Sequence, residues 1–353
     1  MVGRSFDVLR HFVSFGGLRM TVEWPRSRLP VITPHVPRRK NRFVICAVDA
    51  DVYGPIRSGH PRSDRAKWDA SVYESLRRLY TRVDLMAVKA GDLKALASLR
   101  ESGARVVFNL ALSATPMEAA FAACVEFAGM RCTGSGMLAV ALANDKIRSR
   151  RLLSAAGIRV PRFVVLPRGA KPDRIDLTPP LIVKPAMQGS SWGIARDSVV
   201  MTRDAVLDRA RRIWERFDEP AVADEFVQGR ELRVGLIEGN ERRFQIEGIG
   251  EWSFPEGTRG FRIEGSRKNQ RMRILRENEL RTRLRREIAA IAQTAFDTLG
   301  IRGYASLDLR LDALDRLTVL EVNANPGISS DSPIWAGRGF DKTVRRIVEA
   351  ALR

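Results

Sequence analysis

The sequence has little cysteine, histidine or aromatic residue, and it has no long hydrophobic run. Its cysteines, Cys46, Cys124 and Cys132, are too few and too scattered for a disulfide framework, and without nearby histidines they have no zinc-site spacing. No apolar run approaches the roughly 18 residues that a membrane-spanning helix needs. The composition excludes a disulfide scaffold, a zinc module and a membrane span, and it predicts a reduced, cytoplasmic protein.

Acidic residues are few relative to basic ones, with 41 Asp+Glu against 60 Lys+Arg and a net charge of +19 over 353 residues. This balance is typical of proteins that bind nucleic acids or anionic surfaces, so nucleic-acid binding stands as an alternative function. Against it, the sequence has no helix-turn-helix, RNA-recognition or zinc signature, and the aromatic residues do not interleave with the basic runs. We therefore expect no nucleic-acid partner.

Four regions are expected along the chain. Residues 1–42 carry +7 of the net charge and predict a poorly ordered basic extension, with a transit peptide as the rival interpretation. Regular structure is expected to begin at Phe43. Strands and helices alternate in residues 43–135, which is typical of a doubly wound α/β lobe. Residues 136–222 and 223–353 then predict two subdomains of mixed helix and strand.

Local patterns within these regions predict particular elements. Residues 138–158 are strongly helical throughout, and residues 203–217 form an amphipathic helical pattern. Residues 304–312 and 317–323 predict two strands joined by a tight turn. Residues 251–273 have no clear period and are rich in Gly and Arg, which is typical of a mobile or functional loop.

Three oxygen-bearing side chains fall on the two strands nearest the C-terminus. Because side chains alternate along a strand, Glu321 and Asn323 share one face, and Asp308 on the partner strand can lie opposite them. A single acid on a strand is usually solvated, but three oxygen donors flanked by Val and Leu need a cation or hydrogen bonds. This set predicts a site for one or two hard cations such as Mg²⁺, completed by phosphate oxygens.

Two lysines and a loop of small residues suggest phosphate binding. Lys184 ends an apolar strand, where a lysine is often only a snorkelling side chain. The loop 188–193, which follows it, is rich in Gly and Ser and can cradle an anion with backbone N–H groups. Lys146 begins a helix. Together with the cation site, these residues describe a nucleoside triphosphate site in which positive charge neutralises phosphoryl oxygens.

Seven segments in a fixed order are more specific than any one motif alone: TGSG, NDK, IVKPA, QGSSWG, DEFVQGREL, GYASLDLRLD and LEVNANPGISSDSP. Over about residues 43–353 the chain resembles the D-alanine–D-alanine ligase family of the ATP-grasp superfamily. The resemblance implies an α+β ATP-grasp fold preceded by an α/β lobe. It also implies transfer of the ATP γ-phosphate to a substrate carboxylate, attack of an amine on the acyl phosphate, and an amide product with ADP and phosphate.

The resemblance also implies the cofactors, the partners and the nucleotide contacts. The implied cofactors are ATP and two Mg²⁺ or Mn²⁺ ions, and the implied partners are small-molecule substrates. Dimers are common in the family, so a homodimer is one possible assembly. Contacts with the ATP phosphates, adenine and ribose are implied for Lys146, Lys184, Gly189, Ser190, Ser191, Asp224, Glu225, Phe226, Val227 and Glu231. Among these, Ser190 also matches the serine that links to a catalytic hydrogen-bond network.

The resemblance places the reacting groups near the C-terminus. Asp308, Glu321 and Asn323 match metal ligands. Gly327 matches the glycine whose N–H faces the tetrahedral intermediate, and Ser332 matches a serine that binds the substrate carboxylate. The site derived from strand patterns and the site implied by the family coincide.

Several positions depart from the family pattern. Two residues before the first metal ligand, the family has an arginine that stabilises the oxyanion, and this chain has Ser306. Losing such a donor costs about 3 kcal/mol of transition-state stabilisation unless another donor replaces it. Arg310, on the same strand face as Asp308, is a candidate replacement, and Lys268 a candidate for the lid lysine. No glutamate for the first substrate's ammonium follows the first strand. We therefore predict an ATP-dependent carboxylate–amine ligase with an altered substrate pocket.

Two alternatives remain beside that prediction. In the first, the chain is a true D-alanine–D-alanine ligase in which Glu118 or another acid holds the ammonium group. In the second, it binds ATP without ligase activity, as the serine at position 306 and the altered lid suggest. The histidines His11, His35 and His60 lie away from the matched site and are expected to be structural or solvated.

Overall fold

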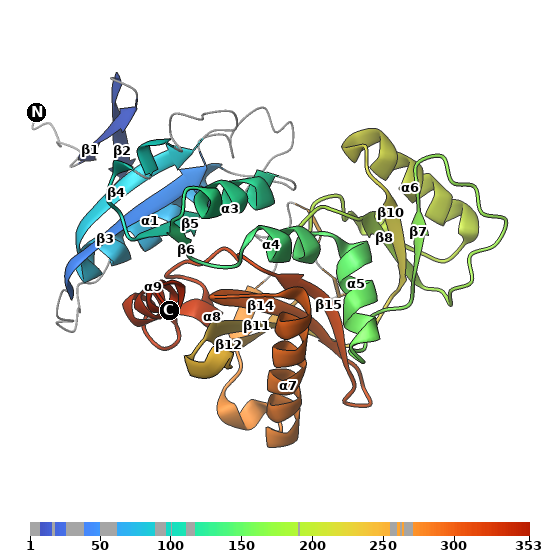
Figure 1. Ribbon diagram of the computed structural model, residues 1–353. Helices are drawn as coiled ribbons and strands as arrows, with labels where there is room; N and C mark the ends of the chain where they lie inside the picture. The colour runs from blue at the N-terminus through green and yellow to red at the C-terminus, as the bar shows by residue number, and fades with distance from the viewer. Residues whose placement is uncertain are drawn as a thin grey trace, which may run out of the picture.

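The structure is a computed structural model, and it describes residues 8–15, 18–25, 39–49, 62–88, 97–99, 101–110, 117–189, 191–254, 260–261, 263–264 and 271–353. Four sheets organise these residues, and the helices lie around and between them (Figure 1). In the described part of the chain, no helix combines the length and the apolarity that crossing a membrane requires.

A parallel sheet forms the N-terminal lobe. Its strands follow the order β4-β3-β5-β6, and they are β4 (Tyr80–Val88), β3 (Arg39–Asp49), β5 (Val106–Leu110) and β6 (Arg131–Cys132). Helix α1 (Arg62–Leu79) buries Val72 and Leu76 in the same cluster as Phe108 of β5 and Val344 of the C-terminal helix. The alternation of strand and helix in the sequence therefore produces the parallel α/β lobe that it predicts.

The basic N-terminal segment contains strands, so the expectation that regular structure begins at Phe43 is wrong. Strands β1 (Val8–Phe15) and β2 (Leu18–Pro25) pair antiparallel, and β3 already begins at Arg39. Residues 18–24 alternate strictly between apolar and polar side chains, which is the strand signal.

The second region is built on an antiparallel sheet of order β7-β10-β8-β9. The strands are β7 (Phe163–Leu166), β10 (Ala221–Glu225), β8 (Leu181–Pro185) and β9 (Val199–Val200). Helix α6 (Arg203–Phe217) covers this sheet, and its Val206 and Ile213 pack in one core with Val183 and Ala223. The helix has the bounds that its amphipathic pattern predicts.

The strongly helical stretch 138–158 forms two helices, α4 (Met137–Asn144) and α5 (Lys146–Ala155), and the second begins at Lys146 as expected. Asp145 separates them with an extended backbone, and its carboxylate accepts hydrogen bonds from the N–H groups of Ile147 and Arg148, both at 2.9 Å. Aspartate favours this N-cap role over a helix interior because its side chain replaces backbone acceptors. The break makes Lys146 the first residue of a new helix.

The C-terminal region is built on a five-stranded antiparallel sheet of order β13-β12-β11-β14-β15. The strands are β13 (Arg271–Ile274), β12 (Phe244–Ser253), β11 (Arg230–Glu238), β14 (Tyr304–Leu311) and β15 (Leu317–Asn323). Helix α7 (Thr282–Leu299) packs Ile288 and Phe296 into a core with Leu307 and Val319. Strands β12 and β13 occupy both ends of the stretch 251–273, which the sequence predicts as a loop.

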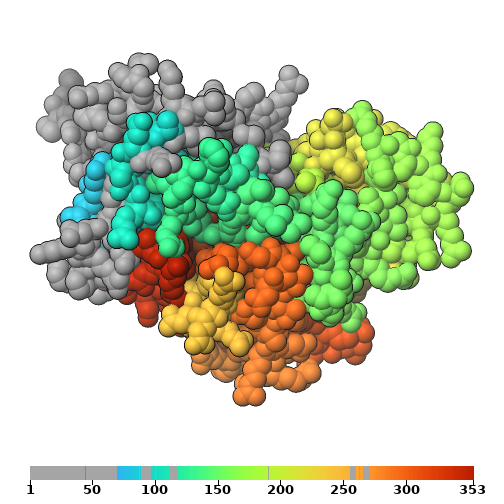
Figure 2. Space-filling view, in the orientation of Figure 1, coloured from blue at the N-terminus to red at the C-terminus, as the bar shows by residue number. Residues whose placement is uncertain are grey.

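Short helices join the three regions. Helices α8 (Pro333–Ala336) and α9 (Phe340–Ala351) follow β15, and α9 lies against α1 of the N-terminal lobe. Helix α3 (Met117–Phe127) packs on α4. Figure 2 shows this green segment across the middle of the visible face, between the orange C-terminal sheet region and the yellow-green region that carries α6. Residues of the β7-β10-β8-β9 sheet and of the five-stranded sheet line a common pocket.

Candidate active site

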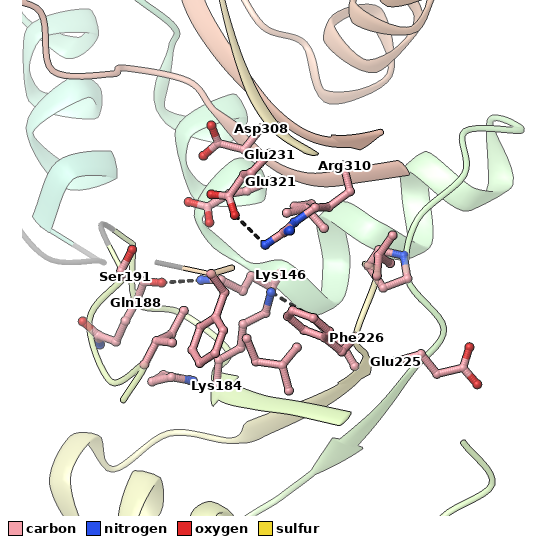
Figure 3. A pocket seen from close by; sticks show the side chains of 18 of the residues that line it. Lys146, Lys184, Gln188, Ser191, Glu225, Phe226, Glu231, Asp308, Arg310 and Glu321 are labelled. Carbon is pink, nitrogen blue, oxygen red and sulfur yellow. Dashed lines mark hydrogen bonds and ion pairs between the residues drawn. The ribbon is translucent and has the colours of Figure 1, made fainter. Parts of the chain in front are cut away.

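An open pocket lies between the β7-β10-β8-β9 sheet and the five-stranded sheet. Its described lining includes many of the residues singled out in the sequence: Lys146, Lys184, Ser191, Asp224, Glu225, Phe226, Val227, Glu231, Asp308, Arg310 and Glu321. Figure 3 shows the lysines on one side of the pocket and the carboxylates of the five-stranded sheet on the other. Opposite charges thus face a common space.

Lys184 extends from β8 and forms a 2.9 Å ion pair with Asp224 on β10. Both residues are buried. Burial, reinforced by the nearby positive charges of Arg150 and Lys146, lowers the pKa of Lys184 to about 8, although Asp224 acts in the opposite direction. Lys184 therefore titrates in a range where an anionic ligand can change its protonation.

Arg150 of α5 is also buried, and its guanidinium pairs with the same Asp224 carboxylate. It donates a further hydrogen bond to the carbonyl of Leu320 on β15, at 3.3 Å. Burial acts to raise the pKa of Asp224, but the positive charges of Arg150 and Lys184 outweigh it and hold the pKa below the usual range. One carboxylate therefore serves two cations at the base of the pocket.

Lys146 reaches the loop after β8, where its ammonium donates to the carbonyl of Gln188. Within this loop Gly193 has φ of +74°, and a Cβ there would lie 2.4 Å from Cγ of Pro185, so only glycine fits. Gly189 is exposed, and apart from its two chain neighbours no atom of the described residues comes within 4 Å of its Cβ position. The backbone at Gly189 is thus accessible to a ligand. Ser190, predicted here, lies outside the described residues.

Residues 260–261 and 263–264 of the C-terminal region, called the covering segment below, lie at one side of the pocket. The ring of Phe261 lines the pocket and meets the ring of Phe226 edge to face, with centroids 5.9 Å apart. The backbone N–H of Glu264 donates to the carbonyl of Ile194 at 2.8 Å. The segment is thereby joined to the loop after β8. Lys268, predicted to act from this segment, lies outside the described residues.

The link between β10 and β11 forms the far end of the pocket. The backbone N–H of Phe226 donates to the carbonyl of Pro180 at 2.9 Å, which fixes this link against β8. The Glu225 carboxylate accepts from Arg162 and from the N–H of Thr178, and it points away from the pocket (Figure 3). Any contribution of Glu225 to a ligand in the pocket would therefore come from its backbone.

Arg310 lies at this same end, where it forms a buried 2.7 Å ion pair with Glu231. Its guanidinium also donates to the carbonyls of Gly229 and Gly260, at 2.8 and 2.6 Å, and lies 5.5 Å from the ring centre of Phe226. Arg310 thus fastens the link and the covering segment together. Its placement gives no support to the expectation that it replaces the oxyanion arginine.

The candidate metal ligands come together as their strand pattern predicts. Asp308 lies directly opposite Glu321 in the β14–β15 pair, and Asn323 lies opposite Ser306. Among the described residues, no three His, Cys, Asp or Glu side chains form a group suited to a metal, so the amide of Asn323 has to complete the set. Its Nδ2 lies 3.5 Å from Oδ2 of Asp308. Two carboxylates and an amide oxygen fit Mg²⁺, which leaves positions for phosphate oxygens.

Arg233 is a pocket residue that the sequence reasoning missed. It extends from β11 opposite Asp308 and holds both carboxylate oxygens, with Nε–Oδ1 and Nη2–Oδ2 distances of 2.6 Å. The signal available in the sequence was its position two residues after Glu231, which places both side chains on one face of β11.

Other predicted residues lie outside the described lining of the pocket. Gly327 is exposed in the segment after β15, and Ser332 precedes α8, where its carbonyl accepts from the N–H groups of Trp335 and Ala336. Glu118 of α3 is buried and accepts a 2.8 Å hydrogen bond from Asn144. Gly327 remains a prediction for the contact with the tetrahedral intermediate, and Ser332 and Glu118 remain predictions for substrate binding.

Comparisons with known proteins agree with this arrangement. Residues 152–349 match the family model described as the D-ala D-ala ligase C-terminus. A D-alanine–D-alanine ligase of Chromohalobacter salexigens is 35% identical over 234 residues, which cover 64% of this chain and 70% of the relative. One of Haemophilus ducreyi is 30% identical over 292 residues, covering 80% of this chain and 91% of the relative.

Solved structures show the same fold. The D-alanine–D-alanine ligase of Bacillus anthracis complexed with ATP superposes with a TM-score of 0.70 at 17% identity, over 89% of this chain and 98% of the other. The VanG D-Ala:D-Ser ligase of Enterococcus faecalis gives a TM-score of 0.68 at 19% identity, over 88% of this chain and 100% of the other. At these identities the likeness concerns the fold alone.

Proposed function

Because the chain belongs to the D-alanine–D-alanine ligase family and is an ATP-dependent ligase that forms C–N bonds, we propose that it joins two small substrates through an acyl phosphate. The ATP-grasp fold predicted from the sequence motifs is confirmed. The observation that carries the proposal is that Lys146 and Lys184 face Asp308 and Glu321 across one pocket. This pairing of cations with a metal-binding surface suits phosphoryl transfer.

ATP would occupy the pocket with its phosphates beside the lysines. Lys146 and Lys184 would neutralise phosphate oxygens, and the backbone of Gly189 and Ser191 would approach them closely. At the other end, the backbone of Phe226 and Val227 would meet the adenine, and Glu231 would accept from the ribose hydroxyls. The support for placing the nucleotide here is that the lining of this one pocket includes both the apolar ring of Phe226 and the two cationic lysines.

Mg²⁺, or Mn²⁺ in its place, would be held by Asp308, Glu321 and Asn323. When bound, the ion neutralises phosphoryl oxygens and orients the transferred phosphate. The chain's own contribution is to fix these donors on adjacent strands, where Val322 and the other inward-facing residues of β15 pack into the core. We propose that two ions bind, as the resemblance implies.

The amine attack would take place beside the metal ligands, at the end of β15. Gly327 and Ser332 follow that strand, so their N–H and hydroxyl groups are the proposed partners of the tetrahedral intermediate and the substrate carboxylate. Ser190 and Lys268 stay proposed members of the same site. Their roles rest on the family resemblance.

We propose further that the substrate pair differs from two D-alanines. The family's oxyanion arginine is replaced by Ser306, and no glutamate follows the first strand at the position that would hold an ammonium group. The names of the curated relatives favour the second candidate, D-alanyl-D-alanine synthesis itself, with Glu118 as the ammonium-binding acid. The two candidates share the ATP half of the site and differ in the amino-acid half.

ADP release tests both levels of the proposal. Purified protein with Mg²⁺ and ATP is incubated with D-alanine alone, and in parallel with a panel of D- and L-amino acids and small amines. Turnover with other substrates but not with D-alanine supports the altered pocket, whereas turnover with D-alanine alone supports the second candidate. Nucleotide binding without ADP release across the panel contradicts the enzyme proposal and favours ATP binding without ligase activity.

Two substitutions locate the activity. Glu321→Gln removes a metal-binding charge, and Lys184→Ala removes a phosphate-binding one, so each is expected to abolish turnover while circular dichroism stays unchanged. Arg151→Met, on the exposed side of α5, is the matched control and keeps its activity. Activity that survives both site substitutions would mean that the site is misplaced.

A further inference from the structure

Arg233 and Asp308 form a two-pronged ion pair at the candidate metal site. The residues lie opposite each other on β11 and β14, and both donor–acceptor distances are 2.6 Å. The side chain of Asp308 is 9% exposed and that of Arg233 is 22% exposed, so the pair is largely shielded from water but Arg233 still reaches the pocket. Such forks are stronger and more directional than single ion pairs.

The surroundings of Arg233 hold it in its charged form. Burial alone would lower its pKa, but the negative charges of Asp308, Glu321 and Glu231 raise the pKa above the ordinary arginine value. Its guanidinium also lies 5.9 Å from the ring centre of Trp252 on the neighbouring strand β12. A fixed positive charge therefore stands among the carboxylates proposed to bind the metal.

The neighbouring position on β14 carries no charge. Ser306 lies two residues before Asp308 on the same face of the strand, opposite Gly235 of β11. Its side chain is fully buried, and within the described residues its hydroxyl has no hydrogen-bond partner. An arginine at position 306 would occupy the strand beside Arg233. The positive charge that position 306 of β14 lacks is therefore supplied nearby by Arg233 on the adjacent strand β11.

We propose that Arg233 is a positioning residue of the phosphoryl-transfer centre, which orients Asp308 and competes with the metal ion for that carboxylate. This proposal rests on the proposed function for its catalytic half. The guanidinium occupies one direction at each Asp308 oxygen and leaves the remaining lone pairs for a metal. Arg233 thus sets how strongly Asp308 binds the ion, and it keeps positive charge at the centre when the ion is absent.

The competition predicts opposite changes in metal affinity and turnover. In Arg233→Met, Asp308 loses its guanidinium partner and a positive charge that repels the ion. We therefore expect Mn²⁺, titrated alone and followed by electron paramagnetic resonance, to bind on the order of tenfold more tightly. The rate of ADP release is expected to fall by about 10²-fold, because the carboxylate loses its fixed orientation and the centre loses a charge. A merely structural role would lower both.

Two variants and a control separate charge from geometry. Arg233→Lys keeps the charge without the fork, so its Mn²⁺ affinity is expected to match the wild type while its turnover stays reduced. Arg230→Met is the matched control, because Arg230 lies on the same strand and grips Glu251 with an equivalent fork of 2.6 and 3.0 Å, outside the pocket lining. It is expected to leave Mn²⁺ affinity and turnover unchanged.

The decisive outcome concerns Mn²⁺ binding and does not require turnover. If Arg233→Met binds Mn²⁺ no more tightly than the wild type, or if its gain persists in an Asp308→Asn background, the competition is refuted. If the wild type binds Mn²⁺ but releases no ADP, the proposed function fails while this comparison still tests the pair. Should Arg233→Met not fold, Arg233→Gln supplies the same comparison, since it also removes the charge.

Discussion

Glu264 and Arg216 form a two-pronged ion pair, with distances of 2.8 and 2.6 Å, between the covering segment of the pocket and helix α6. The same carboxylate accepts a 3.0 Å hydrogen bond from the N–H of Gly193 in the loop after β8. The pairing raises the pKa of Arg216, mainly through the hydrogen bond to Glu264. One carboxylate thus holds the covering segment, the loop and the helix together.

Neutralising that carboxylate is expected to weaken nucleotide binding. In Glu264→Gln the charge-assisted hydrogen bonds to Arg216 and Gly193 are lost, and the loop is held less firmly over the proposed phosphate position. We expect the KM for ATP to rise by roughly 5- to 10-fold. Steady-state kinetics measure the change. Asp208→Asn removes the exposed ion pair with Arg211 on the same helix and is the control. A wild-type KM in Glu264→Gln would show that the contact plays no part.

The pKa of Lys184 predicts that nucleotide binding takes up a proton. The free protein holds this pKa at about 8, below the ordinary 10.5, chiefly because the lysine is buried. Phosphate favours the charged ammonium and raises the pKa on binding, so affinity is expected to fall as pH rises above 8. At pH 8 the uptake is roughly half a proton, and at pH 6.5 it approaches zero.

Calorimetry measures this uptake. Titrations of ATP into the protein are repeated in buffers of different ionisation enthalpy, and the slope gives the number of protons taken up. Lys184→Met serves as the comparison, since it retains any contribution from the nucleotide itself. An equal uptake at pH 8 in both proteins would contradict the assignment of Lys184 to the phosphates.

Removing Arg150 is expected to destabilise the fold. Arg150→Met leaves the buried Asp224 with Lys184 as its remaining cationic partner among the described residues, and breaking one side of a buried ion pair costs about 3–5 kcal/mol. Urea denaturation measures the free energy of unfolding. Arg151→Met, on the exposed side of the same helix, should change it by less than about 0.5 kcal/mol. Asp224→Asn in the Arg150→Met background should recover part of the loss, and a further loss would refute the explanation.

The N-cap of α5 links stability to nucleotide binding. Asp145→Ala removes the acceptor for the N–H groups of Ile147 and Arg148, which is expected to cost about 1 kcal/mol of unfolding free energy. Because Lys146 begins the capped helix, the KM for ATP should rise as well. Asp145→Asn keeps an acceptor and should restore most of the unfolding free energy. If Asp145→Ala unfolds like the wild type in urea, the cap contributes nothing.

The sequence predicted those parts of the site that depend on local alternation. Asp308 and Glu321 face each other as the strand pattern of 304–312 and 317–323 predicts, because side chains two residues apart share a face. The bounds of α6 also agree with its amphipathic pattern. The bounds of α6 need only the period of the element, whereas the position of Asp308 opposite Glu321 also depends on the register shift between Asp308 and Leu309.

Other features depend on contacts between distant segments. The fork between Arg233 and Asp308 joins two residues that are 75 positions apart in the chain, and it follows from the register of β11 and β14, which no local pattern fixes. The partner of Arg310 is Glu231, 79 residues away. The break between α4 and α5, in contrast, has a local signal in the sequence, because an Asp between two helical stretches can serve as an N-cap.

The double contact of Arg150 has a mechanical consequence. One guanidinium donates to Asp224 in the sheet on one side of the pocket and to the carbonyl of Leu320 in the sheet on the other. The side chain of Arg150 therefore joins the two sheets that line the pocket. Moving the two sheets apart at this point would require breaking a buried ion pair or a hydrogen bond of the same side chain.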